Sequence, residues 1–139
     1  ASHRPRSGQD RPVNRSVAPT TIAPPAARYS HAVLSVGPER LLHTSGVVPV
    51  APDGQVPDDL AEQAEVVWAN LGAILAEAGM TTDDVVSMTT FVVQGQELGP
   101  VMAVRDRVLG GHLAASTLVV VPALARPEWR LEIALVAAR

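Results

Sequence analysis

Two charged side chains near the carboxyl end of the chain are the first candidates for chemistry. Arg130 and Glu132 lie two residues apart in a predicted strand, so both point to one face of it. The opposite face is apolar and carries Trp129, Leu131, Ile133 and Leu135. A carboxylate on a buried strand is costly unless it is used or paired. We expect Glu132 to be an acid/base or substrate-orienting group, with a structural ion pair to Arg130 as the alternative. For Arg130 we favour a structural role at a subunit interface.

Polar groups also alternate along two other predicted strands. His43 and Ser45 share a face, and because histidine is a frequent acid/base side chain, His43 is a candidate for this role. A hydrogen-bonded interior histidine is the competing interpretation. Ser45 has no histidine or acid nearby in the sequence, so no nucleophile is expected there. Ala115 and Thr117 share a face at the start of the other strand.

Missing residue types restrict the chemistry. The chain has no cysteine, and all 11 of its basic residues are arginine. Thiolate nucleophiles, lysine Schiff bases and P-loop lysines are therefore excluded. The four histidines are scattered without HxH or HExxH spacing, so we expect no metal site and no cofactor.

The composition indicates one compact domain. The chain has 139 residues, of which 47% are hydrophobic and only 3% aromatic, so Val, Leu, Ile and Ala must fill the core. No apolar run reaches about 18 residues, and no cationic segment leads into an apolar one. We therefore expect neither a membrane span nor a secretion signal, and a cytoplasmic location.

Charge is divided unevenly along the chain. Residues 1–30 carry a balance of +4 and the remainder a balance of −7. Residues 1–26 read as an extended Pro/Arg-rich arm, solvated or lying along an acidic surface, and residues 27–139 as the folded domain. The arm has no clustered basic run and the body is acidic, so we expect no nucleic-acid partner.

One helix and the strand behind it organise the predicted fold. Apolar residues recur at helical spacing from Leu60 to Ala78, Asp59 and Glu62 form a plausible capping pair, and Gly79 suits the helix exit. A β-branched run from Val85 to Val93 follows and predicts a strand.

The remaining elements complete an α+β sandwich. Strands at 31–36 and 40–45 are predicted to form a hairpin, a second helix to span 95–109 and end at Gly110-Gly111, and two last strands to cover 116–121 and 128–136. The order is ββαβαββ, with two helices on one face of a mixed sheet. The run 118–121 is apolar on both faces and no second helical layer remains, so we expect a homo-oligomer.

Several segments in succession resemble the reactive intermediate deaminase (Rid, YjgF-like) family, also called endoribonuclease L-PSP-like. They run in order with family-like spacing over roughly residues 23–138: Tyr29-Ser30-His31-Ala32-Val33, Thr44-Ser45-Gly46-Val47-Val48-Pro49, Gln63 through Asn70-Leu71, Ala78-Gly79-Met80, Asp84-Val85-Val86, Thr90-Phe91-Val92 and Arg130-Leu131-Glu132-Ile133. The resemblance implies a chorismate-mutase-like trimer, in which three sheets form a barrel with helices outside and small-molecule clefts between subunits. Active members hydrolyse enamines and imines to a keto acid and ammonia without a cofactor.

Four residues match the family's site. Tyr29 sits at the cleft tyrosine, Ser45 and Gly46 at the Ser-Gly of the cleft wall, and Glu132 at the acid of the last strand. In the family, a carboxylate and an ordered water carry the proton and hydration steps, so the resemblance makes Glu132 and Tyr29 the catalytic candidates.

Other family positions differ in this chain. The arginine that binds the substrate carboxylate bidentately falls at Ala115, Met102 stands at a cleft asparagine, and Ala27-Arg28 replaces a Gly-Pro. The anion-binding half of the site is lost, and Thr117, His43 and Arg130 are added as substrate-binding candidates by their strand positions.

The resulting expectation is a Rid-like homotrimer. It would act on or bind a small imine, enamine or carbonyl metabolite, but would not be an efficient 2-aminoacrylate-type deaminase. One alternative is an active deaminase in which Arg130, or an arm arginine of a neighbour, replaces the missing cation. The other is a non-catalytic ligand-binding or regulatory trimer. No membrane partner is expected.

Overall fold

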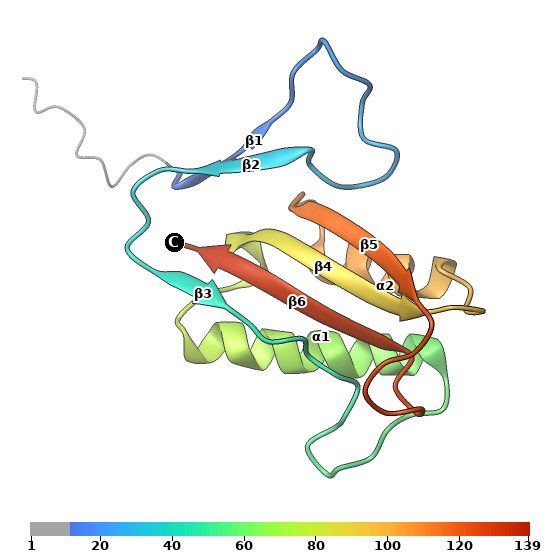
Figure 1. Cartoon of the computed structure of the whole chain (residues 1–139). Helices are drawn as coiled ribbons and strands as arrows, with labels where there is room; N and C mark the ends of the chain where they lie inside the picture. Colours follow the sequence, from blue (N-terminus) through green and yellow to red (C-terminus); the bar gives the residue numbers. More distant parts are fainter. Residues whose placement is uncertain (1–11) are drawn as a thin grey trace, which may run out of the picture.

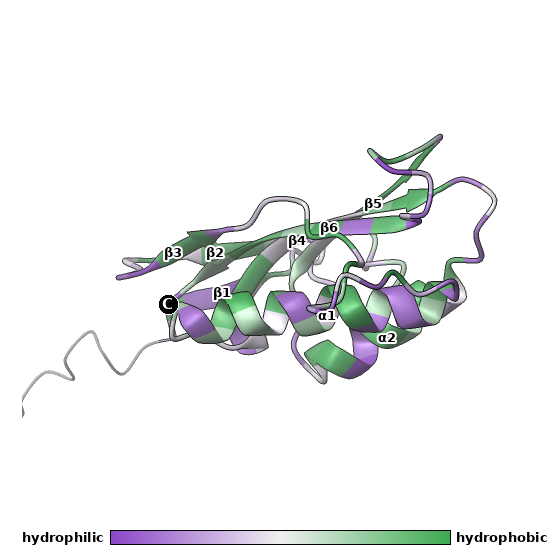
Figure 2. Cartoon of the chain, turned by 90° about the horizontal axis from the view of Figure 1, so that it is seen from below, coloured by the Kyte–Doolittle hydropathy of each residue, from purple (hydrophilic) through white to green (hydrophobic). Residues whose placement is uncertain are grey.

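The structure is a computed structural model that describes residues 12–139. The elements in chain order are β1 (Asn14–Val17), β2 (Ala32–Ser35), β3 (Leu41–His43), α1 (Leu60–Glu77), the 3-10 turn η2 (Thr82–Asp84), β4 (Val85–Val93), α2 (Gly99–Leu109), β5 (Ala115–Val121) and β6 (Leu131–Ala138). A four-stranded mixed sheet has the order β3-β6-β4-β5, and both helices cover one of its faces (Figures 1 and 2). The predicted α+β class with two helices on one sheet face is confirmed.

Helix α1 forms where the periodicity places it. The Asp59 carboxylate accepts the Glu62 N–H at 3.1 Å, which caps the first turn. Gly79 takes φ +70° directly after the helix, a conformation that favours glycine. The buried stripe packs on the sheet and includes Leu60, Ala64, Val67, Trp68, Leu71 and Leu75.

Helix α2 begins four residues later than predicted. Gly95 has φ +85° and turns the chain after β4, and Pro100 lies in the first turn of the helix. Gly110, with φ +60°, follows the last helical residue, as the Gly110-Gly111 pair predicted.

The register of the sheet separates two faces. β4 runs parallel to β5 and antiparallel to β6, with Thr90 opposite Ile133 and Phe91 opposite Glu132. The face under the helices forms the core with Met88, Val92, Leu131, Ile133 and Leu135. The other face, which we call the open face, carries the alternate residues of the same strands.

The predicted hairpin between the strands at 31–36 and 40–45 is wrong. β2 pairs instead with β1, and β3 pairs with β6, where Leu41 lies opposite Ala138. The N–H groups of Glu39 and Arg40 both donate to the Arg139 carbonyl, which turns β3 onto the last strand. Gly37-Pro38 does turn the chain, but the strands that flank it belong to different sheets.

Part of the predicted arm is a strand. β1 forms a two-stranded sheet with β2, and the Asn14 amide donates to the Ala138 carbonyl at 2.8 Å. Ser16 and Ser30 share a hydrogen bond of 2.6 Å between their hydroxyls. The Asn-Arg-Ser-Val sequence of β1 has no apolar alternation, which is why the strand was not predicted. Residues 1–11 of the arm lie outside the described part of the chain.

Within residues 12–139 neither helix is long and apolar enough to cross a membrane.

Candidate functional site

The open face brings several of the predicted site residues onto one surface. Its outward side chains, taken strand by strand from the register, are Leu41 and His43 on β3, Glu132, Ala134 and Val136 on β6, Ser87, Thr89, Phe91 and Val93 on β4, and Ala115, Thr117, Val119 and Val121 on β5. None of these outward residues is an arginine, and Glu132 is the one acid among them.

Glu132 is seated against Gly46. A Cβ built on Gly46 would lie 2.5 Å from Glu132 Cδ and 2.8 Å from Cγ, and would also overlap Oε1. Paired backbone hydrogen bonds between Val47 and Ile133, of 2.8 and 3.1 Å, hold this segment beside β6. A side chain at position 46 would force the Glu132 carboxylate to move, so the glycine allows the close approach of these two residues.

The Glu132 carboxylate is not used by the rest of the described structure. Glu132 is half-buried, and its carboxylate makes no hydrogen bond or ion pair with any residue from 12 to 139. The alternative ion pair with Arg130 is therefore absent from this part of the chain. The Arg130 guanidinium instead reaches Gln96 Oε1 at 3.4 Å, and its backbone N–H donates to Gln63 Oε1 at 3.0 Å.

His43 lies on the open face but at a distance from Glu132. It is opposite Val136, four residues along β6 from Glu132, which corresponds to roughly 13 Å. Its side chain is exposed and borders a hollow of about 120 Å³ that also includes Ser87, Thr89 and Ala134. Its ring forms no hydrogen bond among residues 12–139, so the interior, hydrogen-bonded histidine is not observed.

Ser45 follows β3 and is exposed. The neighbouring Thr44 hydroxyl donates to the Ser45 carbonyl at 2.7 Å and accepts the Leu135 N–H at 3.0 Å. These bonds fix the backbone that leads to Gly46. The Ser45 hydroxyl takes part in neither of them.

Ala115 and Tyr29 meet at the other end of the sheet. Ala115 lies opposite Ser87 and forms a parallel bridge with Ser30, which follows Tyr29 in the sequence. The Tyr29 hydroxyl accepts the Ala26 N–H at 3.3 Å, and its ring stands edge-on to His31. Thr117 is exposed and lies opposite Thr89.

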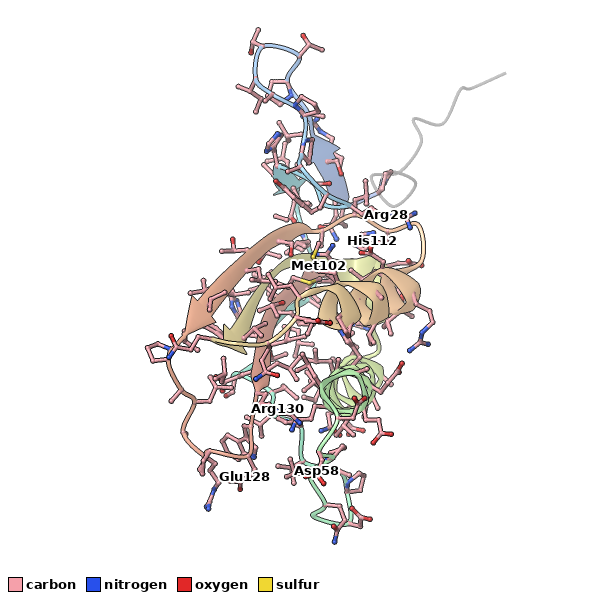
Figure 3. All side chains as sticks on the ribbon, turned by 90° about the vertical axis from the view of Figure 1, so that its right-hand side faces the viewer. Arg28, Asp58, Met102, His112, Glu128 and Arg130 are labelled. Atoms are coloured by element: carbon pink, nitrogen blue, oxygen red, sulfur yellow. The ribbon has the colours of Figure 1, made fainter. Side chains whose placement is uncertain are left out.

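One predicted site residue, Met102, lies away from the open face, and Arg130 lies just outside the strand that carries Glu132. Met102 is half-buried on α2, on the helix side of the sheet, and Arg130 precedes β6. Figure 3 shows Met102 in the upper part of the view with His112 and Arg28, and Arg130 in the lower part with Glu128 and Asp58. One chain therefore does not bring Met102 together with Arg130.

Gln63 is the structural residue that the sequence reasoning did not single out. It is only 1% exposed, donates to the carbonyls of Pro57 and Glu128, and accepts the N–H of Arg130. It ties the loop before α1 to the start of β6. The sequence indicates this role through the position of Gln63, a polar residue within the apolar face of the predicted helix. No cluster of metal-ligating side chains occurs in residues 12–139.

Comparison with known proteins identifies the family that shares this sequence and fold. The family described as Endoribonuclease L-PSP matches residues 20–139. The chain belongs to this family. The rat 2-iminobutanoate/2-iminopropanoate deaminase is 35% identical over 126 residues, which cover 88% of this chain and 89% of that protein. The match to TdcF of Escherichia coli is 31% identical and spans only 58% of that protein's length and 53% of this chain.

Solved structures of the Rid family share the fold. YyfB of Yersinia pestis, a protein of the conserved Rid family, superposes with a TM-score of 0.82 at 34% identity, covering 91% of this chain and 99% of that one. TdcF of E. coli with bound serine superposes with a TM-score of 0.67 at 28% identity, covering 88% of this chain and 93% of that one. The predicted Rid family membership is confirmed.

Proposed function

We propose that this protein is a cofactor-free, small-molecule member of the Rid family, in which Glu132 acts on an imine, enamine or carbonyl group. The observation that carries the proposal is the carboxylate of Glu132, which is seated on Gly46 and has no partner among residues 12–139. A positioned carboxylate can accept a proton from an attacking water and return it to a leaving amine. Addition of water to a C=N bond followed by loss of ammonia leaves a carbonyl compound.

We further propose that a second copy of the chain completes the site in a homotrimer. Ala115 lies opposite Ser87 and Glu132 opposite Phe91, four residues apart along β4, or roughly 13 Å. Tyr29 therefore cannot face Glu132 of its own chain, but the Tyr29–Ala115 end of a neighbour could. The apolar open face supports the assembly, since Val119 is 37% and Leu41 61% exposed in a single chain.

The substrate we propose is not a small α-imino acid. A bidentate arginine–carboxylate contact is charge-assisted, and its loss at Ala115 costs on the order of 2–4 kcal/mol of binding. The strands of the open face carry no arginine in its place, and the Arg130 guanidinium, outside β6, contacts Gln96 Oε1 at 3.4 Å. Tyr29 serves as a positioning group, and Ser45 with Gly46 as the wall of the site.

The test is ammonia release from freshly generated imines of several amino acids, measured by a coupled assay. Wild type is compared with Glu132→Gln and with Glu128→Gln, a control at an exposed carboxylate nearby. We expect slow release from small α-imino acids, lost in Glu132→Gln and unchanged in Glu128→Gln. Rates equal to buffer for every imine tested, or equal rates in all three proteins, would contradict the assignment of Glu132.

Ala115→Arg is the complementary gain-of-function variant. It restores the missing cation, so hydrolysis of small α-imino acids should rise by about tenfold or more. No gain, with the oligomer intact by sedimentation, would contradict the mapping of the carboxylate-binding position onto Ala115.

A further inference from the structure

An apolar hollow lies at the edge of the sheet, on the side that carries the helices. This edge hollow has a volume of about 440 Å³, which is within the size range of small-molecule sites. It is lined by Leu42 from β3 and by Ala73, Ile74, Glu77 and Ala78 from the C-terminal end of α1. Leu42 and the outward-facing His43 alternate along β3, so the sheet separates the edge hollow from Glu132.

The lining of the edge hollow is apolar apart from Glu77. Leu42 and Ala78 pack against the core but are only half-buried, Ile74 is half-buried, and Ala73 is exposed. Apolar groups at such a surface gain free energy when an apolar ligand group removes them from water. The edge hollow therefore suits an apolar chain, and the charges beside it decide which kind.

Two arginines meet at one end of the edge hollow, where β3, the last turn of α1 and the end of β6 lie together (Figure 1). Backbone hydrogen bonds of 2.9 and 3.0 Å hold Arg40 and Arg139 directly opposite each other. Their Nη1 atoms lie 3.5 and 3.3 Å from one acceptor, the carbonyl oxygen of Gly79, which follows Ala78. Arg40 lies two residues before Leu42 and on the same face, roughly 7 Å away along the strand. The two guanidinium groups are thus side by side next to the apolar lining.

The charge of this arginine pair is only partly neutralised within residues 12–139. Arg139 has one ion pair, to Asp84 at 3.8 Å, and Arg40 has none. The dipole of α1 favours cations at its C-terminal end, which explains why the pair is tolerated there. Contact with one carbonyl uses one N–H of each guanidinium, which has five donors, so most of the donors are left for an anion.

We infer that the edge hollow binds an amphipathic monocarboxylate, whose apolar chain fills the hollow and whose carboxylate is bound by Arg40 and Arg139. Glu77 in the lining disfavours a second negative charge on the chain, so dicarboxylates are poor ligands. The comparisons and the roles proposed above assign no part to this surface. It lies on the other side of the sheet from Glu132 and does not depend on the proposed reaction.

The experiment measures ligand binding to the full chain by NMR. Amide chemical shifts are followed during titration with sodium octanoate, below the concentrations at which it forms micelles and at constant ionic strength. Acetate supplies the head group without the chain, and octanol supplies the chain without the charge. We expect saturable octanoate shifts at Leu42, Ile74, Ala78 and Gly79, no saturation by acetate over the same range, and at least tenfold weaker binding of octanol.

Four variants separate charge from space. Arg40→Gln should weaken octanoate binding about tenfold, and Ala73→Gln should weaken it at least threefold by placing a polar side chain in the hollow. Glu77→Gln should strengthen binding, because it removes the one acid of the lining. Arg15→Gln is the control, an exposed arginine of β1 outside the hollow, and should leave the affinity within twofold. Each variant is checked for an unchanged amide spectrum away from its substitution.

The outcomes decide between this site and the surfaces already described. Octanoate shifts that do not saturate, equal affinities for octanoate and octanol, or equal weakening by Arg40→Gln and Arg15→Gln would overturn the site. Shifts centred on the open face, or lost in Glu132→Gln, would place the ligand at the proposed active site and overturn it as well. Saturable binding that depends on Arg40 and persists in Glu132→Gln supports the site, whatever the ammonia assay gives.

Discussion

Replacing Gly46 by alanine tests whether the backbone of the predicted cleft wall positions Glu132. The new Cβ would lie 2.5 Å from Glu132 Cδ, whereas carbon atoms in contact prefer about 3.5–4.0 Å. The carboxylate must therefore move by at least about 1 Å. The atoms that collide are the outer part of a flexible side chain, so the cost in unfolding free energy should stay within about 0.5–1.5 kcal/mol. A misplacement of about 1 Å can cost on the order of 100-fold in rate.

The expected signature is therefore a small loss of stability with a large loss of any Glu132-dependent ammonia release. A double-mutant cycle isolates the contact, because Glu132→Ala removes the three atoms that the new methyl group meets. In urea unfolding at fixed protein concentration, Gly46→Ala should cost about 1 kcal/mol less in the Glu132→Ala background than in wild type. Gly72→Ala is the control, since its Cβ meets nothing and its effect should be the same in both backgrounds.

A cost of Gly46→Ala that is equal in both backgrounds, within about 0.3 kcal/mol, would refute the steric link. Retention of full Glu132-dependent activity by a folded Gly46→Ala protein would show that the site tolerates the displaced carboxylate.

Three further predictions concern the frame of the site. Gln63→Leu leaves two carbonyls and one N–H without partners and should lower the unfolding free energy by about 1–3 kcal/mol in urea titrations; no loss would contradict the ties assigned to this side chain. Asp59→Ala should cost about 1 kcal/mol through the lost helix cap, whereas Asp58→Ala, one residue away, should be nearly neutral; equal effects would refute the cap. Val119→Asp should reduce the sedimenting mass by placing a charge on the open face, while Ala69→Asp on the exposed side of α1 should not; an unchanged mass for Val119→Asp would argue against assembly through this face.

The helix and the central strand that support the site were largely predictable, because the residues that indicate them lie close together in the sequence. The bounds of α1 followed from helical periodicity, the Asp59 cap and Gly79, and the strand at 85–93 followed from its β-branched run. Alternation within a single strand also predicted that Ala115 and Thr117 share a face, as the register confirms. These features depend on residues within a few positions of one another.

The pairing partners of the first strands were not predictable from such signals. The Asn14 amide bonds a carbonyl 124 residues away, and its Asn-Arg-Ser-Val strand has no apolar alternation. β3 pairs with β6 rather than with β2, through hydrogen bonds to Arg139 at the far end of the chain. A turn sequence such as Gly37-Pro38 predicts that the chain changes direction. It does not predict which strand the next segment pairs with.

The sequence by itself determined which side chains of one strand share a face, such as Ala115 and Thr117, and the family resemblance showed that alanine stands where the family has its carboxylate-binding arginine. Tertiary structure decided how far apart those side chains lie, placing His43 and Ala115 each four residues along the sheet from Glu132. It also decided that Gly46 lies over Glu132, through the pairing of Val47 with Ile133, and that Arg40 and Arg139 meet at the Gly79 carbonyl. Face is a local property of a strand, whereas register and contact across the sheet depend on pairing between distant segments.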